Sequence, residues 1–416
     1  MFSVARVFSK PVSGLRVPLL RSFSTRSAVC SEARLNSLYT LSEEEQMLKT
    51  EVARFANDKV KPLVQEMDEN ETLDKGILKG LFDAGLMGIE TPVEYGGSGG
   101  SFMSAILTVE ELAKIDPSIS VICDVQNTLV NTLFRKFGSK HLKEKYLARL
   151  ATDTVGCFGL SEANSGSDAF ALKTRAVKDG SHYIITGSKL WITNSGEADI
   201  FLVFANADPS AGYKGITCFV LDRDMGVQVS AKEKKLGIRC SSTCGLTFDG
   251  IMVPEENILG EYGKGYKYAI EILNEGRIGI AAQMVGLAQG VFDMTLPYLF
   301  ERQQFGEKIG EFQGMQHQYA QAATEIEAAR LLTYNAARLK DEGQPFLYQS
   351  TMAKLYASQI AQKVSSQCID WMGGVGFTRE YPIEKFYRDS KIGTIYEGTS
   401  NIQLSTIAKN LAKRYS

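Results

Sequence analysis

The chain is poor in the residue types that build metal and disulfide sites. Its 416 residues include 3 histidines and 7 cysteines, and the cysteines are scattered along the sequence. A zinc site needs several Cys or His ligands at short spacing, and a disulfide framework normally uses an even number of cysteines. We therefore expect no metal centre and no disulfide framework, and the free thiols suit a reducing compartment.

Charge of one sign and long hydrophobic runs are also missing. The formal net charge is −2, which predicts no surface for nucleic acids. No apolar run reaches the roughly 18 residues that a membrane-spanning helix needs. No G-x-G-x-x-G follows a predicted strand, and the glycine-rich segment 91–100 lacks the Gly-Lys-Ser/Thr of a P-loop. These absences argue against a Rossmann domain and against a P-loop nucleotidase.

The first 31 residues differ in composition from the rest. They are rich in Arg and Ser, and the first acidic residue of the chain is Glu32. This composition is typical of a mitochondrial transit peptide. A disordered basic tail is the alternative interpretation.

Hydrophobic periodicity predicts a helical N-terminal domain over residues 32–155. Ser42 and Glu45 form a capping box, which marks the start of a helix. Further helical segments are expected over residues 81–86, 103–112 and 142–150.

The pattern then changes twice. Residues 156–262 contain short β-branched and aromatic runs separated by turn residues, which predict a small, mostly antiparallel β-domain. These runs cover residues 183–186, 200–204, 216–221, 227–229 and 246–248. Residues 263–416 predict a four-helix bundle, with helices over 266–301, 313–342 and 346–372 and a shorter one after Thr399. The expected fold class is therefore α+β, with three folded domains.

Segment 395–401 carries the strongest chemical signal. Glu397 lies between Tyr396 and Gly398, and Thr-Ser-Asn follows at the start of the terminal helix. The aromatic ring can exclude water, and burial can raise the pKa of the carboxyl group until it works as a base near neutral pH. A surface carboxylate in an ordinary turn is the alternative.

Several other segments, in the same order, resemble those of the acyl-CoA dehydrogenase family. The resemblance extends over residues 38–412. It rests on segments 158–168, 187–194, 235–243, 301–306, 312–313 and 371–376, together with 395–401.

The resemblance implies a three-domain flavoenzyme that binds FAD between the β-domain and the bundle. It assigns Glu397 as the base that removes the α-proton of an acyl-CoA thioester, while the flavin accepts the β-hydride. The N–H of Glu397 is expected to donate to the thioester carbonyl.

The resemblance also assigns FAD contacts. Arg302 would pair with the pyrophosphate, and Trp191 would lie near the flavin ring; a place in the protein core is the alternative for Trp191. The full set is Phe158, Gly159, Leu160, Ser161, Glu162, Ser165, Gly166, Ser167, Trp191, Ile192, Thr193, Arg302, Gln313, Asp370, Trp371, Met372, Gly373, Gly374, Thr399, Ser400 and Asn401.

Substrate contacts follow in the same way. The acyl and pantetheine channel is assigned to Ser167, Tyr213, Tyr266, Asn274, Glu275, Gly276, Arg277 and Gly398. Arg277 would meet phosphate or ribose groups of coenzyme A, with an ion pair on the helix surface as the alternative. Some relatives place the base at the position of Gly276, where this chain has no side chain. Glu275 is adjacent, but on a helix it would point about 100° away.

Within the family, segments 212–217, 265–268 and 274–280 resemble members that act on short and branched acyl chains of the 2-methylbutyryl type. The implied partners are the acyl-CoA substrate and electron-transfer flavoprotein, and the implied assembly is a homotetramer in the mitochondrial matrix. Alternatives are a straight-chain short-chain dehydrogenase, a peroxisomal oxidase, and a non-catalytic flavin-binding assembly protein on the same fold.

Overall fold

Helix α1 (Glu43–Phe55) begins at the predicted capping box. The Ser42 hydroxyl accepts a hydrogen bond from the Glu45 N–H at 3.1 Å, and the Glu45 carboxylate accepts one from the Ser42 N–H at 2.9 Å. This reciprocal bonding satisfies two donors that a helix start leaves free. The structure, a computed structural model, describes residues 37–38 and 40–416. The predicted transit peptide therefore lies outside the described residues.

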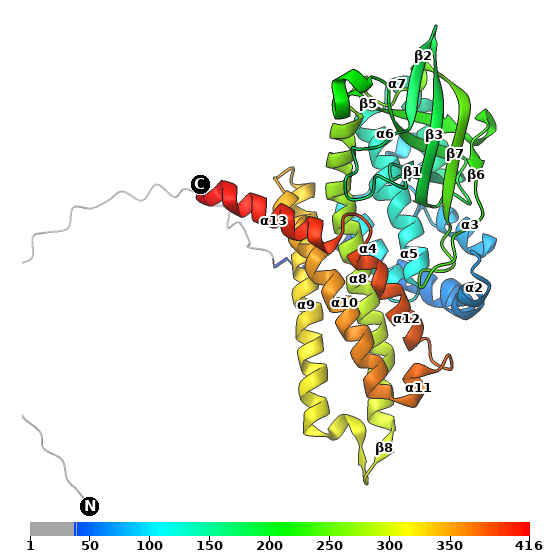
Figure 1. Cartoon of the computed structure of the whole chain (residues 1–416). Helices are drawn as coiled ribbons and strands as arrows, with labels where there is room; N and C mark the ends of the chain where they lie inside the picture. Colours follow the sequence, from blue (N-terminus) through cyan, green and yellow to red (C-terminus); the bar gives the residue numbers. More distant parts are fainter. Residues whose placement is uncertain (1–36, 39) are drawn as a thin grey trace, which may run out of the picture. The chain divides into compact units, whose positions relative to one another are not determined.

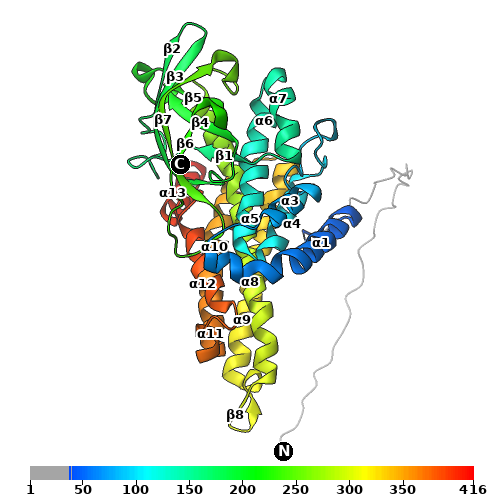
Figure 2. The same ribbon diagram turned by 90° about the vertical axis from the view of Figure 1, so that its right-hand side faces the viewer.

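The N-terminal region is helical, as predicted (Figure 1). After α1 it contains η1 (Ala56–Val60), η2 (Lys61–Leu63), α2 (Val64–Asn70), α3 (Lys75–Asp83), η3 (Val93–Tyr95), α4 (Phe102–Ala113), α5 (Pro117–Asp124), η4 (Val125–Asn131), α6 (Thr132–Phe137) and α7 (Lys140–Thr152). Helices α5 and α6 were not predicted. They are joined without a break by η4, which is π-helical. Figure 2 shows α5, α6 and α7 beside the sheet.

The central sheet is mostly antiparallel, as predicted. It comprises β1 (Gly156–Gly159), β2 (Arg175–Asp179), β3 (His182–Thr193), β4 (Ile200–Asn206), β5 (Ile216–Asp222), β6 (Gln228–Val229) and β7 (Thr243–Pro254). The strand order is β1-β4-β2-β3-β7-β6, and β5 pairs with β4. Strand β4 is parallel to β1 and to β2, whereas the other pairs are antiparallel. Short 3-10 turns lie at Pro209–Gly215 (η5), Arg223–Met225 (η6) and Glu255–Asn257 (η7).

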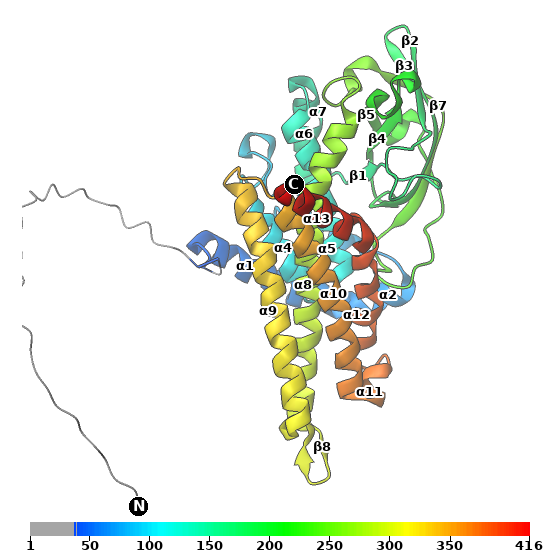
Figure 3. The same cartoon turned by 60° about the vertical axis from the view of Figure 1, so that its left-hand side comes forward.

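The C-terminal region is built on three long helices that lie side by side (Figures 1 and 3). They are α8 (Gly265–Glu301), α9 (Gln313–Asp341) and α10 (Leu347–Met372), and each predicted end is within one residue of the observed one. The hairpin of β8 (Gln303–Gln304) and β9 (Glu307–Lys308), with η8 (Ile309–Glu311), joins α8 to α9. The chain ends with α11 (Gly374–Phe377), α12 (Ile383–Ser390), η9 (Lys391–Thr394) and α13 (Ser400–Tyr415).

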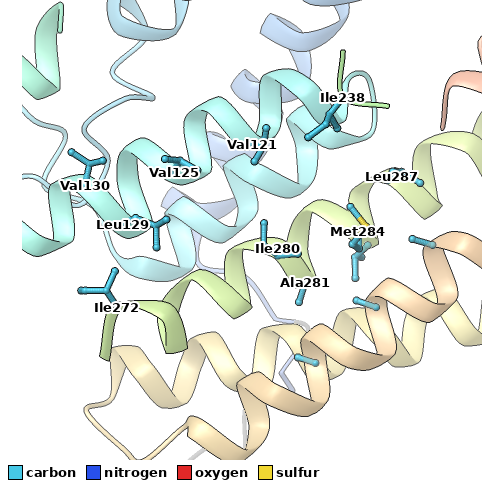
Figure 4. Close-up of a cluster of buried hydrophobic side chains, with 14 of the residues drawn as sticks. Val121, Val125, Leu129, Val130, Ile238, Ile272, Ile280, Ala281, Met284 and Leu287 are labelled. Atoms are coloured by element: carbon cyan, nitrogen blue, oxygen red, sulfur yellow. The ribbon is translucent and has the colours of Figure 1, made fainter. Parts of the chain in front are cut away.

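A shared hydrophobic core fixes the bundle against the N-terminal helices. Figure 4 shows side chains of α5 and η4, among them Val121, Val125 and Leu129, in one buried cluster with Ile280 and Ala281 of α8. Burial of one such side chain stabilises the fold by about 1.5–3 kcal/mol. Within the described ranges, no helix is long and apolar enough to cross a membrane.

Candidate active site

Glu397 lies in the short connection between η9 and α13, in an unusual backbone conformation. Its φ is 51°, and that of Gly398 is 88°. A residue with a side chain is rare in this left-handed region, and the strain must be offset by neighbouring contacts. Thr399 then caps α13 by accepting a hydrogen bond from the Ile402 N–H at 3.3 Å. The predicted helix start is confirmed.

The carboxylate of Glu397 lies against α8 at Gly276, a position without a side chain. Its Oε2 atom is buried and has no hydrogen-bond partner within the described chain. A Cβ atom at Gly276 would lie 2.6 Å from this oxygen and 3.0 Å from Leu129 Cδ2. Gly276 therefore supplies the space that the carboxylate fills, and the present geometry cannot also accommodate a side chain at position 276.

Burial and two cations set the protonation of Glu397. Burial raises the pKa of its carboxyl group to about 7, against the opposing attraction of Lys354 and Arg277. Lys354, on α10, is fully buried, and its Nζ donates to the Gly398 carbonyl at 2.7 Å. A carboxyl group with a pKa near the working pH is well suited to general-base chemistry.

Two further buried groups lie beside Glu397. Asp124 of α5 faces α8, where a Cβ at Gly279 would overlap its Oδ1. Burial, with repulsion from Glu397, raises the pKa of Asp124 well above its ordinary value. The Tyr396 hydroxyl donates to the Gln283 Oε1, so this ring is fixed against α8.

Sequence reasoning missed Asp124 and Lys354. Each is a single charged residue in an otherwise uncharged helical segment, and that isolation was the available signal.

Glu275 and Arg277 point in different directions. The Glu275 carboxylate is fully buried and pairs with Lys136 of α6 at 2.5 Å, so it faces away from Glu397 as the helical geometry predicts. Arg277 donates through Nη1 to Asn274 Oδ1 at 2.8 Å, and its buried Nε has no partner among the described residues. Its assigned contact with coenzyme A stays a prediction.

Aromatic side chains gather where α8 begins. The rings of Tyr213 and Tyr266 meet edge to face at 5.0 Å, and Phe170 meets Tyr266 at 6.3 Å. Ser167, near Phe170 in the chain, is exposed. From Tyr266 to Gly276 the helix rises about 15 Å. Tyr266 and Gly276 therefore lie on the same helix, between its first turn and the carboxylate of Glu397, whereas Glu275 is engaged by Lys136 and is not available to the predicted substrate channel.

The predicted flavin residues on the sheet include a second backbone outlier. Trp191 has a φ of 59° at an irregularity in the β3–β7 pairing, and its side chain is 56% exposed. An exposed tryptophan is not a core residue, and strained backbone of this kind clusters at functional sites, so its contact with the flavin stays a prediction. Ile192 is buried and Thr193 half-buried.

Segment 158–167 begins in β1, and the carboxylate of its Glu162 is already engaged by other residues of the chain. Glu162 pairs with buried Lys189 at 2.8 Å and accepts hydrogen bonds from Lys173 and Thr174. Phe158 packs on Phe204 with ring centroids 5.0 Å apart. The space around Gly166 is open on its Cβ side. Ser165 is buried, and its hydroxyl donates to the Asp168 carbonyl at 2.8 Å. The exposed residues Gly166 and Ser167, rather than the side chains of Glu162 and Ser165, are therefore accessible to a ligand.

The remaining predicted cofactor residues lie elsewhere. Arg302 and Gln313 are exposed beside the β8–β9 hairpin, at the end of the bundle away from the sheet (Figure 1). Residues 370–374 end α10 near α11, and Trp371 is buried, where its Nε1 donates to Gln318 Oε1 at 3.0 Å. Gly373 and Gly374 have open space on their Cβ sides. Within one chain, the predicted cofactor contacts therefore form two groups, one near the sheet and one at the far end of the bundle.

These residues fit a flavin adenine dinucleotide. Trp191 presents an aromatic surface for the flavin ring, and segments 158–167 and 399–401 present hydroxyls and backbone groups. The Arg302 guanidinium suits a pyrophosphate. The donor set is the one that such a cofactor needs, although the individual contacts remain predictions.

Family models match nearly the whole folded chain. The N-terminal domain of acyl-CoA dehydrogenase matches residues 42–154, the middle domain 157–251 and the C-terminal domain 263–412.

Curated relatives match over most of their length. The mitochondrial short/branched chain specific acyl-CoA dehydrogenase of Rattus norvegicus is 57% identical, over 94% of this chain and 90% of the relative. A probable short/branched chain specific acyl-CoA dehydrogenase of Dictyostelium discoideum is 60% identical, over 93% of this chain and 94% of the relative.

Solved structures share the fold. Butyryl-CoA dehydrogenase from Megasphaera elsdenii superposes with a TM-score of 0.88 at 39% identity, covering 90% of this chain and 99% of that one. A structure described as the electron transferring flavoprotein of Acidaminococcus fermentans gives 0.88 at 42% identity, with the same coverage. A glutaryl-CoA dehydrogenase from Mycobacterium smegmatis in complex with FADH2 gives 0.85 at 30% identity, covering 90% and 95%.

The three domain matches, the relatives and the buried carboxylate agree in what they indicate. The chain belongs to the acyl-CoA dehydrogenase family of FAD-dependent oxidoreductases.

Proposed function

We propose that this chain oxidises short, branched acyl-CoA thioesters of the 2-methylbutyryl type to 2-enoyl-CoA, with Glu397 as the base. One observation supports this proposal most strongly. The Glu397 Oε2 is buried, has no hydrogen-bond partner among the described residues, and faces the space above Gly276. A structural carboxylate in a protein interior is normally hydrogen-bonded, whereas a base must keep an oxygen free for the incoming proton.

The chain's own residues account for the proton transfer and for substrate orientation. Glu397 takes the α-proton, and its pKa of about 7 leaves a substantial ionised fraction at neutral pH. The N–H groups of the turn at Glu397 and Gly398 are candidates to bind the thioester carbonyl and stabilise enolate charge. Tyr396 and Leu129 exclude water from the carboxylate. Bound FAD supplies the acceptor for the β-hydride.

The substrate class is supported by the relatives. The rat and Dictyostelium relatives are named for short and branched chains. Leu129 and Asp124 lie opposite α8, close to the carboxylate, and limit the space beside it. A straight-chain short-chain dehydrogenase is the second candidate, because the Megasphaera enzyme of the same fold is named for butyryl-CoA.

The remaining parts of the proposal concern the assembly. We assign electron-transfer flavoprotein as the electron acceptor, which the Acidaminococcus structure supports by its description. We assign the protein to the mitochondrial matrix; the name of the rat relative supports a mitochondrial location. A homotetramer is supported by the separation of Arg302 and Gln313 from the sheet-side flavin residues. The domains are assigned to residues 32–155, 156–262 and 263–416.

Glu397→Gln tests the assignment of the base. Glutamine has nearly the same shape, so folding, FAD content and acyl-CoA binding should persist. Loss of a general base typically costs about 10²–10⁴ in rate. Stopped-flow reduction of the flavin by 2-methylbutyryl-CoA should therefore fall by at least that factor, while spectral shifts on binding remain. Reduction of the variant at wild-type speed would remove Glu397 from the mechanism.

A panel of acyl-CoAs separates the two substrate candidates. Turnover with electron-transfer flavoprotein as acceptor should be highest, as kcat/KM, for 2-methylbutyryl-CoA and isobutyryl-CoA. A clear preference for butyryl-CoA would favour the straight-chain alternative.

A further inference from the structure

Lys354 lies in the middle of α10, outside every motif that the sequence suggested. Its side chain is completely buried, and its Nζ donates to the Gly398 carbonyl at 2.7 Å. Burying an ammonium group is costly unless other groups compensate for the lost water. A fully buried lysine whose hydrogen bond goes to a backbone carbonyl, rather than to a carboxylate, therefore calls for an explanation.

The carbonyl that Lys354 contacts belongs to the strained turn that carries the base. Glu397 and Gly398 both have positive φ, at 51° and 88°. Gln403 of α13 also holds this turn, because its Nε2 donates to the Glu397 carbonyl at 3.1 Å and to the Gly398 carbonyl at 2.9 Å. Two donors from different helices thus converge on one carbonyl. A strained conformation persists only where surrounding contacts fix it in this way.

The charge of Lys354 acts on Glu397 from the same position. Lys354 attracts the carboxylate electrostatically, while Oε2 keeps no hydrogen bond within the described residues. The other ionisable groups around the carboxylate are Arg277 on α8, Asp124 on α5 and the Tyr396 phenol. Burial lowers the pKa of Lys354 to about 7, with Glu397 opposing this shift and Arg277 adding to it.

We propose that Lys354 is the positioning residue of the base: it fixes the Glu397–Gly398 turn through the Gly398 carbonyl and favours the ionised form of the neighbouring carboxylate without occupying its free oxygen. The inference rests on the proposed role of Glu397. Lys354 has two roles in this proposal: it anchors the turn by a hydrogen bond, and its charge acts on the carboxylate. Gln403 shares the first role but not the second, because it carries no charge.

The two roles predict different kinetics in variants of the holoenzyme. Lys354→Met loses both the bond and the charge, so the pH midpoint for flavin reduction should move to higher pH by about one unit. From a midpoint of about 7, this shift lowers the ionised fraction of Glu397 at pH 7, and with it the rate, roughly fivefold. Gln403→Ala loses hydrogen bonds alone, so its rate should fall at every pH with an unchanged midpoint.

Ser358→Ala is the matched control. Ser358 lies one turn beyond Lys354 on α10, is equally buried, and donates to the Lys354 and Gly393 carbonyls at 2.7 and 2.8 Å. It does not touch the Glu397–Gly398 turn. Its replacement should lower stability but leave both the rate and the pH midpoint near those of the wild type.

The experiment combines stopped-flow reduction from pH 5.5 to 9 with an infrared titration of the Glu397 carboxyl group in the absence of acyl-CoA. The Glu397→Gln variant identifies the carboxyl band. A shifted midpoint in Lys354→Met, seen by both methods and absent from Gln403→Ala and Ser358→Ala, supports the proposal. Lys354→Gln, which keeps a donor and loses the charge, should show the same shift and replaces Lys354→Met if the methionine variant does not fold.

The outcomes also separate this inference from the proposed function. If Glu397→Gln is inactive but the neutral Lys354 variants keep the wild-type midpoint, Lys354 has no such role and Glu397 remains the base. If Glu397→Gln is reduced at wild-type speed, the proposed function fails first.

Discussion

Two buried lysine–glutamate pairs in this molecule have the same composition and different behaviour. In the sheet, the Glu162 carboxylate accepts hydrogen bonds from Lys189 at 2.8 Å and from the Thr174 hydroxyl at 2.6 Å. In the bundle, Lys354 bonds to a backbone carbonyl, and Glu397 Oε2 is left without a partner among the described residues. This difference in hydrogen bonding agrees with a structural role for Glu162 and with the proposed role of Glu397 as the base.

Protonation follows from that difference. Burial alone would raise the pKa of Glu162, but the attraction and hydrogen bond of Lys189, with bonds from Thr174 and the Lys173 N–H, lower it. Burial lowers the pKa of Lys189 to about 8, so both groups stay charged at pH 7. Burial raises the pKa of Glu397 to about 7, since no hydrogen bond offsets it.

The largest expected effect comes from breaking the sheet pair. Lys189→Met leaves the Glu162 carboxylate buried without its cation, which typically costs about 3–5 kcal/mol of unfolding free energy. Flavin retention should fall as well, because Glu162 fixes segment 160–162. Urea denaturation and bound-flavin absorbance measure the two effects.

Lys178→Met is the control in the same sheet. Lys178 pairs with Glu255 at 2.8 Å, but both side chains are about half exposed. Exposed pairs contribute about 0–1 kcal/mol. Equal destabilisation by the two variants would contradict the distinction between the buried and the exposed pair.

A smaller effect is expected from filling the space beside the base. Gly276→Ala places a Cβ 2.6 Å from Glu397 Oε2, so the carboxylate must move. Displacement of a catalytic group by about 1 Å can cost about 10² in rate. Flavin reduction should fall by that order. Gly314→Ala, on α9 with no atom within 4 Å of the new Cβ, should change nothing. An unaffected Gly276→Ala enzyme would show that the carboxylate is not confined as described.

The smallest change comes from pH alone. The ionised fraction of Glu397 falls about tenfold for each unit well below its pKa, so kcat/KM should decline below about pH 7. The Glu162 pKa is lowered on folding. Its stabilising contribution is therefore present above its ordinary pKa of 4.5 and is lost as the pH falls through the lower folded value.

Between pH 5 and 7, activity should therefore change while the Glu162 contribution to unfolding free energy stays constant. Measuring the rate of flavin reduction and the unfolding free energy over the same pH range checks whether the two quantities behave differently. A flat rate profile through pH 7 would contradict the protonation assigned to Glu397.

Long periodic elements were predictable from the sequence, and short or irregular ones were not. Helices α8, α9 and α10 repeat apolar residues over many turns, so their ends could be placed to within one residue. Strand β2 buries a single residue, and β1 has two glycines in four positions, so neither shows a strand pattern. Helix α12 has eight residues, and its buried Ile383 and Phe386 are separated by charged ones.

The candidate site shows the same limit. Glu397 was identifiable because its chemistry is concentrated in one segment. Lys354 and Asp124 act on it from α10 and α5, more than 40 residues and more than 270 residues away in the chain. Periodicity gives the face of a helix but not the residue that the face will meet. Packing between helices supplies that information.

The π-helical segment η4 makes the surface opposite Glu397 sensitive to the number of residues in the α5–η4–α6 helix. It inserts additional backbone into an otherwise continuous helix and ends just beyond Leu129, the side chain that faces Gly276. Deleting one residue within 125–131 would allow an ordinary α-helix. The helix after the deletion would keep nearly its present orientation, because the wider π-helical turns take up the additional residue, but side chains within the segment would turn to other faces. Different side chains of η4 would then face Gly276 and Glu397, although none of the residues that now face them had been substituted. The surface opposite Glu397 thus depends on the number of residues in this helix, and insertions or deletions at this point test the proposed acyl specificity in a way that point substitutions do not.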